Sequence, residues 1–223
     1  MSHFTVAVFT KTGFEEEIER LLAPYDEQNE DYFEFETDED GDEIEGHEEK
    51  GWLYNPNAKW DWWEIGGRWY GLLKLLPGKT GKCGQRSWTN KDKPEEPGHC
   101  NSARVCDVDF SMDEDKFKKA LRFWELYVDG EPLRPGEEMP DTWYRREYFI
   151  EQFGDKETYA LSRAEFGTYA FVSSDGKWHG EARMGWWGMD DNTREKREAQ
   201  RFDMVQYVHD HPDEYITIVD CHI

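Results

Sequence analysis

The chain lacks long apolar stretches and is poor in basic residues. It contains no run of 18 consecutive apolar residues, and its N-terminus has no apolar segment typical of a signal peptide. Its 27 lysines and arginines are outnumbered by 50 aspartates and glutamates, which gives a net charge of -23. Proteins that hold a nucleic-acid backbone or an anionic membrane surface need clustered basic residues, so neither long nucleic acid nor a membrane is an expected partner. We therefore expect a cytoplasmic protein.

Common catalytic signatures are also missing. The sequence has no P-loop, no G-x-S-x-G motif, no H-E-x-x-H motif and no dinucleotide-binding fingerprint. Its cysteines are few and irregularly spaced, at Cys83, Cys100, Cys106 and Cys221, which favours free thiols over a disulfide framework. A zinc site that combines the first three with His99 stays open as an alternative. Whether the protein is an enzyme, and which cofactor or metal it uses, also stays open.

Aromatic residues are abundant instead, and they are densest between Asn55 and Trp69, which reads N-P-N-A-K-W-D-W-W-E-I-G-G-R-W. Indole rings beside a guanidinium can stack a planar ligand and bind its anionic group. A second tryptophan pair, also framed by glycines, follows near the C-terminus. The predicted ligand-binding residues are Trp60, Asp61, Trp63, Glu64, Arg68, Trp69, Trp186 and Trp187. The alternative is a tryptophan-rich core in which Arg68 pairs with Asp61 or Glu64.

Strand periodicity refines this prediction. An extended run from Trp60 to Glu64 would place Trp60, Trp62 and Glu64 on one face and Asp61 and Trp63 on the other. Glycines 66 and 67 should then bend or bulge the chain before a second extended run.

Three residues are candidates for acid–base catalysis: His179, Asp220 and His222. The closing run Tyr215–Ile223 predicts a strand in which Asp220 and His222 share one face. Such a pair can orient an imidazole as a base or hold a metal ion, although chain ends also carry incidental polar pairs. Together with carboxylates, these groups suit metal-assisted hydrolysis of a nucleotide or another phosphoester.

The hydrophobic pattern predicts an α+β fold with a mainly antiparallel sheet, about four helices and two ferredoxin-like halves. We expect one domain over residues 1–223, with an acidic insertion at 26–50 and a long loop at 77–103. The predicted strands are His3–Thr10, Val105–Phe110, the hairpin Thr168–His179 and the closing run, and the predicted helices are Phe14–Ala23, Asp113–Tyr127, Asp141–Phe153 and Thr193–Val208.

The acidic insertion has an alternative role. Between Asp26 and Glu49 it carries 14 acidic residues and neither lysine nor arginine. The plain interpretation is a solvated hairpin that turns at Asp40 and Gly41. Dense carboxylates can also imitate phosphates and occupy the DNA-binding groove of a host protein.

Five segments together resemble a family of uncharacterised proteins from bacteriophages and their hosts. The segments are L-L-A-P-Y-D-E (Leu21–Glu27), the tryptophan-rich Asn55–Trp69, D-G-K-W-H (Asp175–His179), M-G-W-W-G-M (Met184–Met189) and V-D-C-H-I (Val219–Ile223). The resemblance covers both ends of the chain but not its middle loop, and it implies a phage or prophage setting. Because phage accessory proteins often act against host defences, we expect an accessory protein that binds a small anionic or nucleotide-like ligand, or a host protein. Its location would then be the host cytoplasm.

Overall fold

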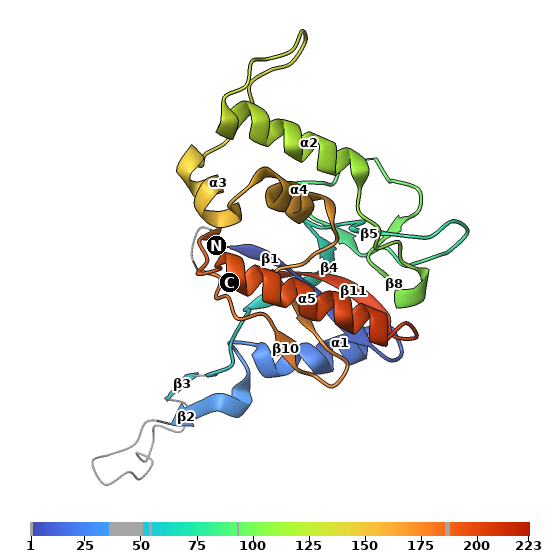
Figure 1. Cartoon of the computed structure of the whole chain (residues 1–223). Coiled ribbons are helices and arrows are strands. Elements are labelled where there is room, and N and C mark those ends of the chain that lie inside the picture. Colours follow the sequence, from blue (N-terminus) through green and yellow to red (C-terminus); the bar gives the residue numbers. More distant parts are fainter. Residues whose placement is uncertain (1, 36–50, 54, 93, 186–187) are drawn as a thin grey trace.

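A seven-stranded mixed sheet lies at the centre of the molecule (Figure 1). The computed structural model describes residues 2–35, 51–53, 55–92, 94–185 and 188–223. The strands of the sheet are β1 (His3–Thr10), β4 (Trp62–Gly67), β6 (Gln85–Arg86), β8 (Ser102–Arg104), β9 (Ala170–Val172), β10 (Trp178–His179) and β11 (Tyr215–His222). They follow the order β10-β9-β1-β11-β4-β6, and β8 also pairs with β11. Two small sheets pair β2 (Phe33–Phe35) with β3 (Gly51–Leu53) and β5 (Leu73–Lys74) with β7 (His99–Cys100).

The first and last strands of the chain form the middle of this sheet. β1 and β11 pair antiparallel over their whole length, from His3 opposite His222 to Thr10 opposite Tyr215. Both predicted strands are thus confirmed, and so is the α+β class. The sheet is mixed and not purely antiparallel, because β1 pairs in parallel with β9 and β4 pairs in parallel with β6.

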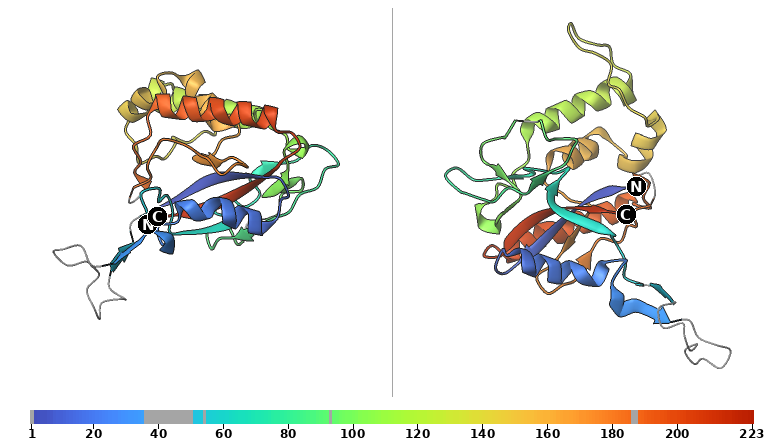
Figure 2. Two further views of the ribbon diagram at one scale, coloured as in Figure 1. Left: turned by 90° about the horizontal axis from the view of Figure 1, so that it is seen from below. Right: turned by 180° about the vertical axis from the view of Figure 1, so that it is seen from behind.

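One helix covers each face of the sheet. α1 (Glu15–Leu22) buries Ile18, Leu21 and Leu22 against one face, and α5 (Arg194–Asp210) buries Met204 against the other. Figure 2 shows the two helices on opposite sides of the sheet. The predicted pair of ferredoxin-like halves is not formed, because the first and last strands pair within one central sheet and do not belong to two separate sheets.

Three further helices form a layer with an aromatic core of its own. α2 (Glu114–Trp124), α3 (Arg146–Phe153) and α4 (Lys156–Ala164) pack around Phe123, Phe149 and Tyr159. The pattern predicted α2 and most of α3, but α4 is rich in small and polar residues and was missed. The predicted strand Val105–Phe110 is wrong, since Val105–Asp107 forms a 3-10 turn. Five α-helices therefore lie in the described part of the chain.

The two ends of the sheet differ in what they hold. We call the end at His3 and His222 the terminal end, because Ser2 and Ile223 hydrogen-bond to each other there through their backbones. We call the end at Thr10 and Tyr215 the turn end, because turns connect the elements there.

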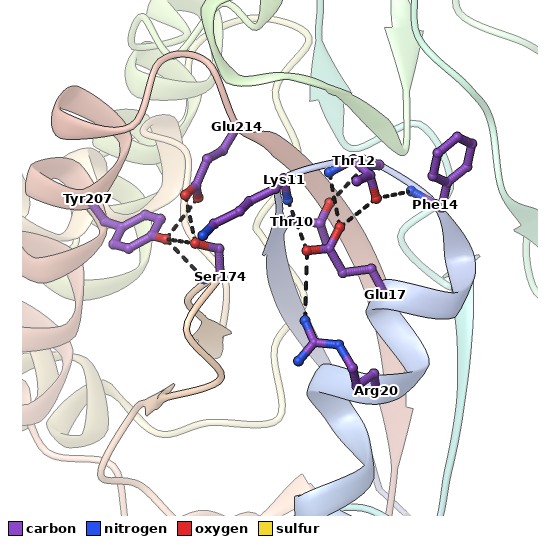
Figure 3. Close-up of polar contacts among 10 residues, drawn as sticks. Thr10, Lys11, Thr12, Phe14, Glu17, Arg20, Ser174, Tyr207 and Glu214 are labelled. Atoms are coloured by element: carbon purple, nitrogen blue, oxygen red, sulfur yellow. Dashed lines mark hydrogen bonds and ion pairs between the residues drawn. The ribbon is translucent and has the colours of Figure 1, made fainter.

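Polar side chains fasten the turn end (Figure 3). The Tyr207 hydroxyl donates to Glu214 Oε2 at 2.8 Å and accepts from the Ser174 backbone N–H at 3.0 Å. The Ser174 hydroxyl donates to the other Glu214 oxygen at 2.6 Å. Across the same end, the Glu17 carboxylate accepts hydrogen bonds from the backbone N–H groups of Lys11 and Thr12. The first set of contacts joins α5, the β9–β10 turn and the segment before β11, and the second joins the start of α1 to the turn after β1.

The acidic insertion lies mostly outside the described residues. Its flanks, β2 and β3, pair antiparallel as a hairpin would require, whereas the predicted turn at Asp40 and Gly41 falls within the undescribed range 36–50. Within the described residues, no helix is both long enough and apolar enough to cross a lipid bilayer.

Candidate functional site

Polar residues gather on one face of the sheet at the terminal end. His222 lies directly between His3 and Trp62, and Asp220 lies directly between Thr5 and Glu64. Residues opposite one another on neighbouring strands project to the same face. Ile218, one pair further along β11, packs in the core beneath α5, so this is the α5 face. Three strands thus bring polar groups from positions far apart in the sequence onto one surface.

The first half of the site is a histidine–aspartate pair. Asp220 is fully buried, and its Oδ1 lies 2.8 Å from Nδ1 of His3. Its Oδ2 accepts a hydrogen bond of 2.8 Å from the backbone N–H of Arg68. Gly67 makes this approach possible, because a Cβ atom there would lie 2.3 Å from Asp220 Oδ2 and 2.7 Å from Glu64 Oε1. The Gly66–Gly67 bend is therefore fitted around the Asp220 carboxylate.

The second half repeats the arrangement with different partners. His222 Nδ1 lies 2.6 Å from Asp61 Oδ1, and the rings of His3 and His222 meet edge to face with centroids 4.9 Å apart. A neutral imidazole bound this way donates its Nδ1–H to the carboxylate and keeps the lone pair on Nε2. Two oriented imidazoles thus lie side by side, each able to act as a base through Nε2.

Carboxylates outnumber the imidazoles around this surface. We call His3, Glu27, Asp61, Glu64, Asp220 and His222 the terminal-end cluster. Burial raises the pKa of the Glu64 carboxyl, and the charge of Asp220 raises it further against the opposing effect of His3. Burial also raises the pKa of Glu27, with added repulsion from Asp61. Carboxyl groups with raised pKa values that crowd oriented histidines are typical of functional sites.

A cavity of about 440 Å³ opens beside the cluster, between the sheet and the helices α4 and α5. We call it the first cavity. His3, Thr5 and Trp69 line it on the sheet side, and Arg197 and Gln200 are among the α5 residues that line the opposite side. This volume falls within the range of small-molecule sites.

The first cavity contains polar groups without a hydrogen-bond partner in the described part of the chain. The Tyr169 hydroxyl and the Gln200 Nε2 are buried, and neither has a hydrogen-bond partner among the described residues. Burial raises the pKa of the Tyr169 phenol, so it stays protonated and can donate. Buried polar groups in native proteins normally have hydrogen-bond partners, so we expect a ligand or a water molecule to hydrogen-bond to these two groups.

A positive charge lies beside these groups, in the first turn of α5. Arg197 donates to both the backbone and the side-chain oxygens of Gln152, at 3.0 and 2.6 Å. Its charge is therefore held by a neutral partner, at the helix end where the macrodipole is also positive. Farther along α5, Arg201 is ion-paired with Glu165.

The predicted ligand-binding tryptophans separate between two faces. Trp69 lines the first cavity, as predicted for a ligand site. Trp60 is buried and Trp63 is partly buried in the core beneath α1, on the other face, which agrees with the alternative of an aromatic core for these two. Asp61 reaches His222 because β4 begins only at Trp62, so the predicted alternation does not extend back to Asp61.

Arg68 does not join the cluster through its side chain. Its guanidinium is exposed and lines a second cavity, and it pairs with neither Asp61 nor Glu64. Glycines 66 and 67 both have positive φ values, 89° and 51°, and the turn that they begin sends Arg68 and Trp69 to different cavities.

His179 also lies apart from the other two catalytic candidates. It is on β10, three strands from β11, which corresponds to roughly 14 Å at the usual strand spacing. Its ring stacks on Phe171 with centroids 4.1 Å apart, and its Nε2 is 3.2 Å from the Ser173 hydroxyl. Burial lowers its pKa. The structure gives His179 a packing environment and does not place it beside Asp220 and His222.

The predicted pair Trp186 and Trp187 lies outside the described residues. The residues that flank it are fixed at the terminal end, because the Ser2 hydroxyl donates to Gly185 O and accepts from the Gly188 N–H at 2.8 Å. Ser2 precedes His3, so Gly185 and Gly188 are held close to the terminal-end cluster.

Sequence reasoning missed several residues of the site, among them Glu27 of the cluster, the cavity residues Tyr169, Arg197 and Gln200, and two residues on the sheet. His3 forms the pair with Asp220, and Trp62, 48% exposed, lies against it edge to face with ring centroids 6.4 Å apart. The only signal for His3 was its alternation with Thr5 at the start of β1. That signal identifies His3 as a site residue only when β1 is known to pair with β11.

The segments that carry the phage-protein resemblance meet in space. Tyr25 hydrogen-bonds with Gly176 O and the Trp178 N–H, and its own backbone oxygen accepts from Lys59. Asp61 then joins the closing strand through His222. No protein-family model, curated protein or solved structure matches the chain. The resemblance therefore stays a prediction.

Metal ligation has no ready-made site in the described parts of the chain. No group of three or more histidine, cysteine, aspartate or glutamate residues there is arranged to hold a metal ion. The four cysteines are free thiols, as predicted, with Cys100 and Cys221 buried and Cys83 and Cys106 exposed.

Proposed function

We propose that the protein binds a small ligand with a planar ring and an anionic group, such as a nucleotide, in the first cavity. The observation that carries this proposal is the convergence of an indole, an oriented histidine and a cationic helix start on one cavity: Trp69, His3 and Arg197. The phage-protein resemblance is compatible with an accessory role of this kind, directed at a host molecule.

The chemistry of the lining matches such a ligand. The Trp69 indole offers a stacking surface, and stacking on an aromatic ring contributes about 1–3 kcal/mol per base. The anionic group would bind near Arg197, where the N-terminal end of α5 adds backbone dipoles. Tyr169 and Gln200 would gain the hydrogen-bond partners that they lack. The overall charge of -23 repels long nucleic acids but leaves a local site for one small anion.

Calorimetric titration with nucleoside mono-, di- and triphosphates tests the binding role. We expect Trp69→Ala to weaken the best nucleotide about 5- to 150-fold, the equivalent of the stacking energy. Trp143→Ala is the matched control, because Trp143 is fully exposed in the loop before α3, and it should bind as the wild type does. Equal affinity in both variants would remove the first cavity as the site.

The two histidine–carboxylate pairs favour a second candidate, hydrolysis of a phosphoester in the bound ligand. One imidazole would take a proton from the attacking water through Nε2, while the other, protonated, would donate its proton to the leaving oxygen. The adjoining rings of His3 and His222, with both Nδ1 atoms held by carboxylates, support this candidate.

Turnover separates the two candidates. If the protein is a hydrolase, His3→Gln and His222→Gln should each lower kcat by at least about a hundredfold, the usual contribution of a positioned acid or base. Ligand affinity should change far less. If the wild type binds a nucleotide and leaves it intact, with and without added Mg²⁺, Mn²⁺ or Zn²⁺, the binding role stands alone.

Deleting residues 30–48 tests the acidic insertion. A ligand site in the first cavity should survive the deletion, because the described residues that line it all lie elsewhere in the chain. Loss of a host-protein interaction in the same variant, with nucleotide binding retained, would show that the insertion carries a separate protein-binding role.

A further inference from the structure

A second cavity lies on the other side of the turn that follows β4. It has a volume of about 550 Å³, and Arg68 and Tyr70 line it from this turn. Trp69, between them in the sequence, lines the first cavity instead. The turn thus separates two cavities, and the guanidinium that the sequence assigned to the tryptophan pocket belongs to the second.

The second cavity holds two guanidinium groups. The guanidinium of Arg86 lies 4.0 Å from the centroid of the Tyr70 ring and donates to Asn90 O at 3.1 Å. Stacking of this kind fixes the plane of an arginine, and the same guanidinium also forms an ion pair with Glu95 Oε1, 3.9 Å away. The acidic residues of the lining, Glu95 and Glu96, have side chains that are 79% and 74% exposed. They can therefore turn towards solvent when an anion enters.

Buried asparagines hold the backbone beside Arg68. Asn90 Nδ2 donates to Gly67 O at 2.8 Å, and Asn101 Nδ2 donates to Trp69 O at 2.9 Å. Asn101 Oδ1 also accepts from the Gly71 N–H at 3.0 Å. The base of the Arg68 side chain is therefore fixed, while its guanidinium forms no hydrogen bond or ion pair with another described residue.

A histidine of the lining also has an unpaired nitrogen among the described residues. Nδ1 of His99 is buried without a hydrogen-bond partner among the described residues, and its nearest carboxylate oxygen, on Glu96, is 3.6 Å away. Two guanidiniums thus line one hollow together with a buried imidazole nitrogen; among the described residues, the Arg68 guanidinium has no hydrogen bond or ion pair and the His99 nitrogen has no hydrogen bond. In a chain with a charge of -23, this arrangement suits an anion better than any other ligand.

We propose that the second cavity is a separate binding site for a phosphomonoester, whose phosphoryl group is held between the guanidiniums of Arg68 and Arg86. Planar guanidinium forks match the geometry of phosphate oxygens and bind them in pairs of hydrogen bonds. The site does not depend on the ligand of the first cavity, because the two share the turn but no lining residue.

Titration with inorganic phosphate and with phenyl phosphate, followed by calorimetry at constant ionic strength, tests this site. We expect saturable binding of one phosphate group per chain and at least about tenfold weaker binding in Arg68→Gln, since hydrogen bonds to charged groups contribute strongly. The fold should persist in that variant, because only the backbone N–H of Arg68 serves Asp220. Arg145→Gln, at an exposed arginine before α3, is the matched control and should bind normally.

Three results would overturn the proposal. They are the absence of saturable binding by either probe at millimolar concentration, equal affinity in Arg68→Gln and wild type, and equally tight binding of succinate, which lacks a phosphoryl group. Trp69→Ala distinguishes the two cavities: it should keep phosphate binding and lose only the nucleotide site. If Trp69→Ala instead abolishes phosphate binding, the phosphate belongs to the first cavity and the second site is rejected.

Discussion

The two ends of the central sheet carry polar clusters of opposite character. At the turn end, the side chains of Tyr207, Ser174 and Glu214 form hydrogen bonds with one another, and the Glu17 carboxylate accepts hydrogen bonds from backbone N–H groups. At the terminal end, four carboxylates crowd two imidazoles whose Nε2 atoms form no hydrogen bond within the described chain. A cluster whose groups satisfy one another stabilises a fold, whereas one with excess charge beside a cavity costs stability and is retained for function.

The carboxyl pKa values express this difference. Burial and Asp220 raise the pKa of Glu64 at the terminal end. Burial would also raise the pKa of Glu17 at the turn end, but hydrogen bonds from Thr12 and Lys11 and the charge of Arg20 lower it overall. Folding therefore opposes ionisation of Glu64 and favours ionisation of Glu17.

The largest expected effect comes from filling the bend beside Asp220. Gly67→Ala adds a Cβ within 2.3 Å of the buried carboxylate at a φ of 51°. We expect it to lower the free energy of unfolding by roughly 2–5 kcal/mol, from left-handed backbone strain and overpacking together, and to abolish ligand binding. Chemical denaturation and calorimetry measure the two effects.

Gly78→Ala is the matched control for this change. Its φ is 79°, but a Cβ there would have no neighbour within 4 Å. Backbone strain alone should lower its free energy of unfolding by about 1–2 kcal/mol, and ligand binding should be unchanged. If Gly67→Ala were no worse than Gly78→Ala, the close fit around Asp220 would be refuted.

A smaller effect should follow from breaking the turn end. Tyr207→Phe leaves Glu214 and the Ser174 N–H without the hydroxyl that they share. We expect a loss of about 1–3 kcal/mol, seen as a melting temperature lower by roughly 2–12 °C, with nucleotide binding unchanged. Tyr144→Phe, at a half-exposed tyrosine, should change stability by less than about 0.5 kcal/mol. If Tyr207→Phe lost nucleotide binding, the turn end would not have a purely stabilising role, and this would contradict the difference between the two ends.

The smallest effects are opposite changes in stability when the two carboxyls are neutralised. A raised folded-state pKa means that Glu64 supports folding below its unfolded pKa of about 4.3 and opposes folding as the pH rises through its folded value. Glu64→Gln should therefore stabilise the protein at pH 7 and lose this gain near pH 4. Glu17→Gln should destabilise it at pH 7, and the deficit should shrink as the pH falls. Urea denaturation between pH 3 and 8 measures both, and the same sign for both variants at pH 7 would contradict the electrostatic account.

Local patterns predicted the elements better than the site. β1 and β11 are dense in β-branched and aromatic residues, as strands buried on both faces are, and the apolar spacing of α1 matches the face that it buries. The pairing of His3 with Asp220 depends on the register between the two ends of the chain, and no local pattern encodes that register.

The sequence could not show, for a related reason, that the side chains of Arg68 and Trp69 line different cavities. The sequence indicated a bend at the glycine pair, but the direction of each side chain after it follows from two positive φ values and from contacts with Asp220 and Asn101. The asparagine and aspartate lie far away in the sequence. The candidate ligand residues were thus correctly placed near one bend, while their division between two cavities needed the folded chain.

The most direct test of whether the terminal-end cluster is the ligand site is NMR of the histidine side chains during a nucleotide titration. Histidines at both ends of the sheet give signals in the same spectrum. His3 and His222 report on the terminal end, and His211, which stacks on Tyr207, reports on the turn end. We expect at least one nucleotide to shift the imidazole signals of His3 and His222 saturably and to leave His211 unchanged. If no nucleotide moves the first two, or if all three move together, the terminal-end cluster is not the ligand site.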